Sequence, residues 1–182
     1  MTRAKANQYL VISALGQDRP GIVHDLTQHV TEAGCNIDDS RMTVLGGEFA
    51  VLMLVEGNWN AVAKLEAQLP ALEKKLDLTI TGKRTTGQPE NQSGGRPYSV
   101  EVIAIDHPGI INSLANFFSS RSINIQDLYT DSYRAAHTGS QMFSANMTVN
   151  IPAEVQIARV RDEFLDFCDS LNLDAVLEPV KG

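Results

Sequence analysis

The sequence is short of cysteine, of long apolar runs and of basic residues. Its two cysteines, Cys35 and Cys168, lie far apart without a CxxC spacing, so we expect two buried thiols in a reducing compartment. No apolar run approaches the roughly 18 residues that a membrane-spanning helix needs. The polar segment 1–7 has no apolar core of the signal-peptide type. These absences predict a cytoplasmic protein that does not enter a membrane.

The balance of charge is acidic. There are 15 lysines and arginines against 22 aspartates and glutamates, and the formal net charge is −7. A protein that grips nucleic-acid phosphates needs a concentrated basic face, whereas the adjacent basic pairs here are only Lys74-Lys75 and Lys83-Arg84. The composition therefore disfavours direct binding to nucleic acid.

Signatures of catalysis and of metal binding are also missing. No GxSxG, Walker or dinucleotide motif occurs. His24 and His29 are five residues apart, so they do not share a helix face as a metal-binding pair at a spacing of four does. Asp38-Asp39 lacks the alternating oxygen ligands of a calcium loop. We therefore expect no enzyme activity, no cofactor and no metal.

The sequence does contain an internal repeat. The segment Asp18-Arg19-Pro20-Gly21-Ile22 recurs as Asp106-His107-Pro108-Gly109-Ile110, and Asn36-Ile37 recurs as Asn124-Ile125 at the same offset of 88 residues. Each DxPGI segment follows an apolar strand-like run and precedes a helical pattern. Matched neighbours and a second matched motif indicate a duplication.

The first copy has a legible order of helices and strands. Its first helix is predicted to carry Pro20 in its first turn and to stop at Gly34. Two β-rich runs at 36–45 and 48–55 are joined by Gly46-Gly47, a hairpin signal. Apolar residues at helical steps from 62 to 76 and an alternating run at 78–81 complete the copy.

The second copy repeats this order with a hairpin between Gln126 and Asn150 that is about six residues longer, which aligns Phe49 with Phe143. Each half thus reads βαββαβ, the ferredoxin-like arrangement with an antiparallel sheet, and the fold class is α+β. Because each half is small, we expect the halves to pack together or on a second chain.

Between the copies, the segment 84–97 reads RTTGQPENQSGGRP and has no large apolar side chain. It cannot bury enough surface to offset the entropy of ordering, so it is predicted to be a linker. The predicted domains are residues 8–83 and 98–180.

The repeated motifs resemble the ACT domain over most of both halves, and two such domains with a short linker are similar to the family of glycine cleavage system transcriptional repressors. In ACT domains the ligand commonly lies between the DxPGI loop and the start of the second strand, often at a domain–domain interface. The resemblance nominates as ligand-binding residues Asp18, Gly21, Ile22, Asn36 and Ile37 in one copy and Asp106, Gly109, Ile110, Asn124 and Ile125 in the other.

The chemistry of these residues suits an amino acid. Main-chain N–H groups at the start of a helix attract a carboxylate, and the asparagine offers both an acceptor and donors. A purely structural interpretation also stands, in which the aspartates cap helices and the asparagines tolerate an awkward backbone angle. In the second copy, the long hairpin with Tyr129, Tyr133 and His137 can cover or reshape the site.

The resemblance implies a non-enzymatic regulator that responds to glycine or a similarly small amino acid and controls expression of the glycine cleavage system. It would act through a DNA-binding regulator protein as partner, and a homodimer is compatible with it. Two alternatives are an ACT interaction module that binds no ligand and a regulatory relative of formyltetrahydrofolate deformylase, whose long additional domain is absent here.

Overall fold

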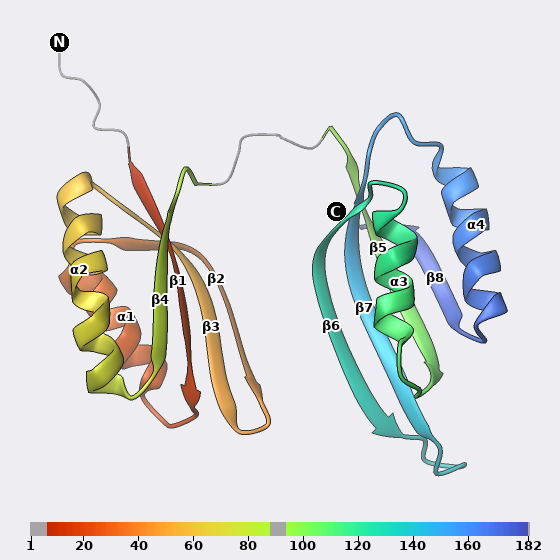
Figure 1. Cartoon of the computed structure of the whole chain (residues 1–182), viewed down its shortest axis with the longest axis horizontal. Helices are drawn as coiled ribbons and strands as arrows, with labels where there is room; N and C mark the ends of the chain where they lie inside the picture. The colour runs from red at the N-terminus through yellow and green to blue at the C-terminus, as the bar shows by residue number, and fades with distance from the viewer. Residues whose placement is uncertain (1–6, 88–93, 182) are drawn as a thin grey trace. The chain divides into compact units, whose positions relative to one another are not determined.

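The computed structural model describes residues 7–87 and 94–181, and the chain divides into two compact units at residue 90 (Figure 1). The first unit consists of β1 (Gln8–Gln17), α1 (Ile22–Glu32), β2 (Asn36–Leu45), β3 (Glu48–Gly57), α2 (Trp59–Leu76) and β4 (Thr79–Thr85). The second consists of β5 (Arg96–Ile105), α3 (Ile110–Ser119), β6 (Asn124–Arg134), β7 (Gln141–Ile151), α4 (Ile157–Ser170) and β8 (Asp174–Pro179).

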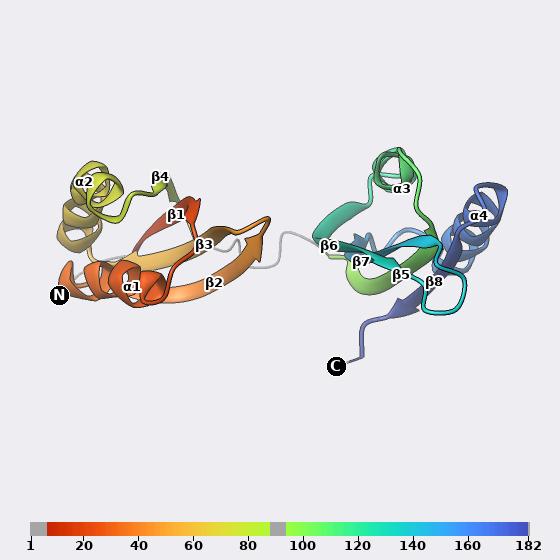
Figure 2. The ribbon, with the colours of Figure 1, turned by 90° about the horizontal axis from the view of Figure 1, so that it is seen from below.

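Each unit has one antiparallel sheet. The strand orders are β2-β3-β1-β4 and β6-β7-β5-β8, and every pairing is antiparallel. Figure 2 shows both helices of a unit on the same side of its sheet. The predicted α+β class and the two ferredoxin-like βαββαβ units are therefore confirmed.

The core of each unit lies between the helices and one face of the sheet. On β1, Leu10, Ile12 and Ala14 are at most 2% exposed, and on β5 alternate residues are buried in the same way. Successive side chains of a strand point to opposite faces, so only one face of each sheet enters the core. In the second unit an aromatic cluster fills the space under the helices; its rings are those of Phe117, Phe118, Phe164 and Phe167.

The start of α1 differs in detail from the prediction. The helix begins at Ile22 after Gly21, whose φ is 87°, so Pro20 lies in the preceding turn and not in the first helical turn. A left-handed residue at this position is needed because the chain reverses from the sheet into the helical layer. Gly109 has a φ of 95° at the same point of the second unit, and glycine adopts such angles without steric cost.

The predicted hairpins are confirmed, including the greater length of the second. Gly46 and Gly47 both have positive φ, as a two-residue hairpin turn requires. The second hairpin gains four residues in the turn between β6 and β7 and one in each strand. Phe49 pairs with Gly16 and Phe143 with Ala104, which are equivalent positions of β1 and β5.

The strands extend into the segment predicted to be a linker. Arg84 and Thr85 belong to β4 and pair with β1, while Arg96 and Pro97 belong to β5 and pair with β7. Backbone hydrogen bonds to a neighbouring strand do not depend on apolar side chains. Composition alone therefore made the predicted linker too long at both ends. The middle of the predicted linker, residues 88–93, lies outside the described residues.

The end of the first helix is left-handed in both units but is filled by different residues. Gly34 has a φ of 86°, and Ser122, its equivalent, has a φ of 56°. A residue with a Cβ is strained in this region by about 1 kcal/mol. The second unit therefore has the same backbone conformation at this position although it has no glycine there.

We predict that Ser122→Gly raises the free energy of unfolding by about 0.5–1 kcal/mol, because it relieves this strain. Ser113→Gly, inside α3, is the matched control and should lower it by a similar amount, since glycine weakens a helix interior. Chemical denaturation monitored by circular dichroism measures both changes. A Ser122→Gly variant less stable than the parent would contradict the strain argument.

Candidate functional site

The two DxPGI turns, which we call corner 1 (residues 18–22) and corner 2 (residues 106–110), lie at the same end of their sheets. Corner 1 follows β1 and is held to the β2–β3 turn by the Asp18 N–H, which donates to the Gly47 carbonyl at 3.2 Å. Corner 2 follows β5 and is held by the Asp106 N–H, which donates to the Gln141 carbonyl at 2.9 Å. The first residue of each corner is thus hydrogen-bonded to the hairpin beside it.

The helices that leave the corners carry free main-chain donors. The first helical hydrogen bond of α1 runs from the Asp25 N–H to the Gly21 carbonyl at 2.9 Å, so the N–H groups of Val23 and His24 precede it and have no acceptor in the helix. No side-chain hydrogen bond caps α1 or α3. The alternative that Asp18 and Asp106 are helix caps is therefore wrong, because a left-handed glycine occupies the cap position.

Corner 1 carries a cation that the sequence analysis did not single out. The Arg19 Nη2 donates to Asp25 Oδ2 at 2.9 Å, and both side chains are about two-fifths exposed, at 41% and 37%. Arg19 Nη1 also donates to the Pro20 carbonyl at 3.4 Å. The guanidinium is therefore held beside the start of α1, where it adds positive charge to the free N–H groups.

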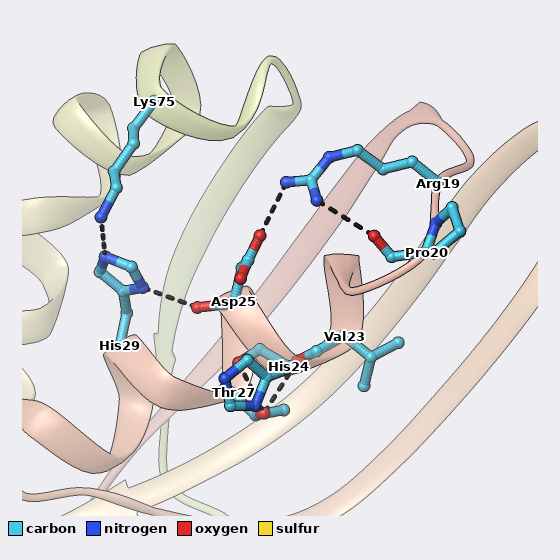
Figure 3. A network of polar contacts seen from close by, with 8 residues as sticks. All are labelled: Arg19, Pro20, Val23, His24, Asp25, Thr27, His29 and Lys75. Atoms are coloured by element: carbon cyan, nitrogen blue, oxygen red, sulfur yellow. Dashed lines mark hydrogen bonds and ion pairs between the residues drawn. The ribbon is translucent and has the colours of Figure 1, made fainter.

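Figure 3 shows that this contact continues into a network across both helices. His29 Nδ1 lies 2.6 Å from the Asp25 carbonyl oxygen, and His29 Nε2 lies 3.2 Å from Lys75 Nζ on α2. Because the ammonium group can only donate, Nε2 accepts and Nδ1 donates its proton to the carbonyl. His29 is thus part-buried and hydrogen-bonded through both ring nitrogens.

Corner 2 lacks this network. His107 stands in place of Arg19 and contacts only the Pro108 carbonyl, at 3.1 Å from Nδ1, and Ser113 and Phe117 stand where Asp25 and His29 do. The two corners therefore share a backbone but differ in charge.

The asparagines named with the corners lie at the opposite end of each sheet. Asn36 pairs with Glu56, which pairs with Tyr9, and corner 1 begins nine residues further along β1. At the rise of a β-strand this separation is about 30 Å. Asn124 is equally far from corner 2, because it pairs with Asn150, which pairs with Pro97. One unit alone does not bring the two halves of the predicted site together.

Neither asparagine adopts an awkward backbone angle. Both begin an edge strand, and neither has positive φ, so that structural alternative is also wrong. Each is exposed and is followed, one residue later, by a β-bulge, between Ile37 and Asp39 in β2 and between Ile125 and Asp127 in β6. The bulge occurs at the same place in both copies although the residue in it differs.

The isoleucines of the predicted site belong to the core. Ile22 and Ile110 are each 3% exposed, while Ile37 and Ile125 pack against the two cores. They position the corners and the strand starts; the side chains of Ile22 and Ile110 are closed to a ligand, whereas those of Ile37 and Ile125 are partly exposed. The polar side chains of the predicted site that solvent reaches are those of Asp18, Asn36, Asp106 and Asn124.

A shallow pocket lies at corner 1. Its wall is formed by residues 18–24 and by Met42 from the far end of β2. Met42 could not be found from the sequence, because only the hairpin register brings it beside a loop that precedes it by more than one secondary-structure element.

Comparison with known proteins identifies the family. The ACT domain matches residues 8–83. The glycine cleavage system transcriptional repressor of Escherichia coli is 37% identical over 175 residues, which are 96% of this chain and 92% of that protein. The chain belongs to the ACT-domain family of glycine cleavage system transcriptional repressors.

Other matches agree with this family. A crystal structure assigned as a glycine cleavage system transcriptional repressor is 31% identical, covers 97% of this chain and 99% of its own, and has a TM-score of 0.70. A protein of unknown function from Galdieria sulphuraria is 27% identical over 96% of this chain and has a TM-score of 0.76. A UPF0237 protein from Methanopyrus kandleri is 35% identical over 44% of this chain and 84% of its own length. The family makes this chain a regulatory protein.

The long hairpin does not place its tyrosines over corner 2 of this repressor-family chain. Tyr129 pairs with Asn146 and Tyr133 with Met142, and both lie on the face of the sheet that the helices leave open. The expectation that they cover the site is therefore wrong, because strand register turns them away from it. The base of the hairpin does touch corner 2, through Gln141.

Within the ranges 7–87 and 94–181, no three His, Cys, Asp or Glu side chains lie close enough to hold a metal ion. No helix of the described part of the chain is long and apolar enough to cross a membrane.

Both thiols are buried. Burial raises the pKa of Cys35, and burial with the nearby Asp169 carboxylate raises the pKa of Cys168 to about 12.

We predict that neither thiol reacts with Ellman's reagent at pH 7.5 in the folded protein, because the thiolate is the reactive form and a raised pKa keeps it protonated. Both should react within seconds in guanidinium chloride. Counting released thionitrobenzoate with and without denaturant measures this. Rapid labelling of Cys168 in the native protein would show that its surroundings are more open than the structure has them.

Proposed function

We propose that this chain is an amino-acid-responsive regulator of glycine cleavage system expression, acting in the cytoplasm through a DNA-binding protein partner. The relative that matches it over 96% of its length supports the regulated process. The acidic charge of −7 supports action through a partner. The observation that carries the response to an amino acid is the pair of uncapped helix starts at Gly21 and Gly109.

The ligand's carboxylate would bind at a corner. Two successive N–H groups, those of Val23 and His24 at corner 1, point from the positive end of α1 without an acceptor in the helix. Arg19 stands beside them, already paired with the Asp25 carboxylate. Glycine is favoured among amino acids because the relative that matches 96% of this chain is named for the glycine cleavage system.

The ligand's ammonium group would bind to an aspartate or an asparagine. Asp18 is exposed and is next to the free donors of corner 1. Since Asn36 is about 30 Å away within one unit, an asparagine can complete the site only from another ACT unit, either the second unit of the same chain or a unit of a second chain. A site shared between units makes ligand binding favour their association, because a ligand shifts an equilibrium by its difference in affinity for the two states.

We predict that glycine or serine raises the melting temperature of the purified chain by several degrees at saturating concentration, since a ligand at 100 times its dissociation constant adds about 2.7 kcal/mol of stability. Asp18→Ala and Asn36→Ala should each abolish the shift. Differential scanning fluorimetry with a panel of amino acids measures it.

Asp38→Ala and Asn60→Ala are the matched controls, because these side chains are equally exposed and lie outside the corners; both should keep the shift. Loss with Asp106→Ala would place a second ligand at corner 2. Unchanged melting with every amino acid would rule out sensing and leave an ACT interaction module.

A further inference from the structure

The two sheets have open faces of different character. The helices cover the faces with Leu10 and Val100, so the alternate residues of each strand face away from the core. We call the two open faces face 1, on the sheet of β1, and face 2, on the sheet of β5. Within each unit, both helices lie on the other side of the sheet, as Figure 2 shows.

Face 2 carries a set of carboxylates, and the basic residues Arg161 and Lys181 lie at its β8 edge, in the same pocket as Glu178. Two of the carboxylates lie on β6, two on β8 and one on β5. Residues that pair across neighbouring strands lie on the same face of a sheet, and the strand pairings place all five on the open face. They are Glu101, Asp127, Asp131, Asp174 and Glu178, and all are exposed.

The equivalent positions of face 1 do not carry them. The duplication places there Ser13, Asp39, Thr43, Thr79 and Lys83, so one carboxylate is shared and one position has the opposite charge. The fold therefore does not require the acidic residues, because the first unit has the same fold without most of them.

The carboxylates of face 2 are not satisfied by the chain itself. Among residues 7–87 and 94–181, none of them accepts a side-chain hydrogen bond or an ion pair; the arginines of the second unit that form ion pairs do so with Glu163 on the helical side. The charge of face 2 is thus available to a partner.

Apolar and aromatic side chains stand among these carboxylates. Ile103 is 43% exposed, Tyr129 68% and Val176 46%, and Asp174 pairs with Ile103 while Glu101 pairs with Val176. Exposed apolar groups surrounded by charge are typical of a surface that binds another protein.

The charge decides which partner fits. A second face 2 would set like charges against each other, which costs several kcal/mol in protein association, and nucleic acids are themselves anionic. Face 1 of any copy offers Lys83 and Arg41, and Arg41 already pairs with Asp39. The surface that fits is a protein surface with several lysines and arginines around an apolar centre.

We infer that face 2 binds the basic, DNA-contacting surface of the regulator through which this chain acts, and so competes with DNA for it. This rests on the proposed function, which requires a DNA-binding partner. Such a partner must carry a concentrated basic face, because neutralising phosphates supplies most of its affinity for DNA. Face 2 offers carboxylates on both edge strands, which match that kind of surface.

The test uses a reporter fused to the promoter of the glycine cleavage operon, in cells deleted for the chromosomal copy of this gene. The face 2 variant is Asp131→Asn, Asp174→Asn and Glu178→Gln together. The control is Asp162→Asn, Asp166→Asn and Asp169→Asn together, on the exposed side of α4. We expect the face 2 variant to weaken repression about tenfold, as loss of several charge contacts does, and the control to repress like the parent.

The outcomes separate the two ideas. If the parent chain itself does not repress the reporter, the proposed function is wrong. If the parent represses and the face 2 variant represses equally well, the proposed function stands and face 2 is not the contact. Equal melting temperatures of the parent and both variants, measured on purified protein, ensure that a loss of repression reflects the surface and not unfolding.

A photo-crosslinking amino acid in place of Tyr129 identifies what covers face 2 in the same cells. We expect an adduct with a DNA-binding protein whose crosslinked peptide belongs to its basic DNA-contacting surface, and none when the crosslinker replaces Leu52 on face 1. An adduct with a second copy of this chain, or within the chain, would overturn the inference. So would an adduct with the regulator away from its DNA-contacting surface.

Discussion

Burial of one sheet face under two helices is the constraint from which the rest of this structure follows. Leu10, Ile12 and Ala14 of β1 alternate with exposed or half-exposed residues, and α1 and α2 present apolar stripes to them. Two helices suffice to cover one face of a four-stranded sheet, and no third layer exists in either unit. The fold therefore leaves an open face in each unit, whose residues are free to diverge.

The duplication shows which features the fold requires. Both units keep the left-handed glycine before the first helix, the left-handed residue after it, and the bulge that follows the strand-opening asparagine. These are backbone features, and Ser122 keeps the conformation of Gly34 at a cost in strain. The side chains on the open faces and around the corners have diverged. The two copies therefore differ mainly at their surfaces, within a backbone that both share.

In the proposed function, the position of the corners relative to the asparagines is the physical means of regulation. A site inside one unit would be occupied without changing how units associate. Free N–H groups at one end of a sheet and an asparagine at the other, about 30 Å away, can meet on one small ligand only when two units, of one chain or of two, come together. A ligand held in this way couples its own concentration to assembly, and it can thereby control whether an acidic face is presented to a partner.

The sequence by itself determined the repeat, the order βαββαβ, the hairpin turns and the absence of a basic face, because these depend on local periodicity, on turn-forming residues and on composition. DxPGI predicted a strand-to-helix turn because proline and glycine favour turns, whereas the left-handed angle of Gly21 was seen only in the structure. The distance from Asn36 to corner 1, the approach of Met42 to that corner and the gathering of Glu101, Asp131 and Glu178 on one open face were decided by tertiary structure. Each depends on strand register between segments that are distant in the sequence, and register is fixed only when the sheet closes over its core.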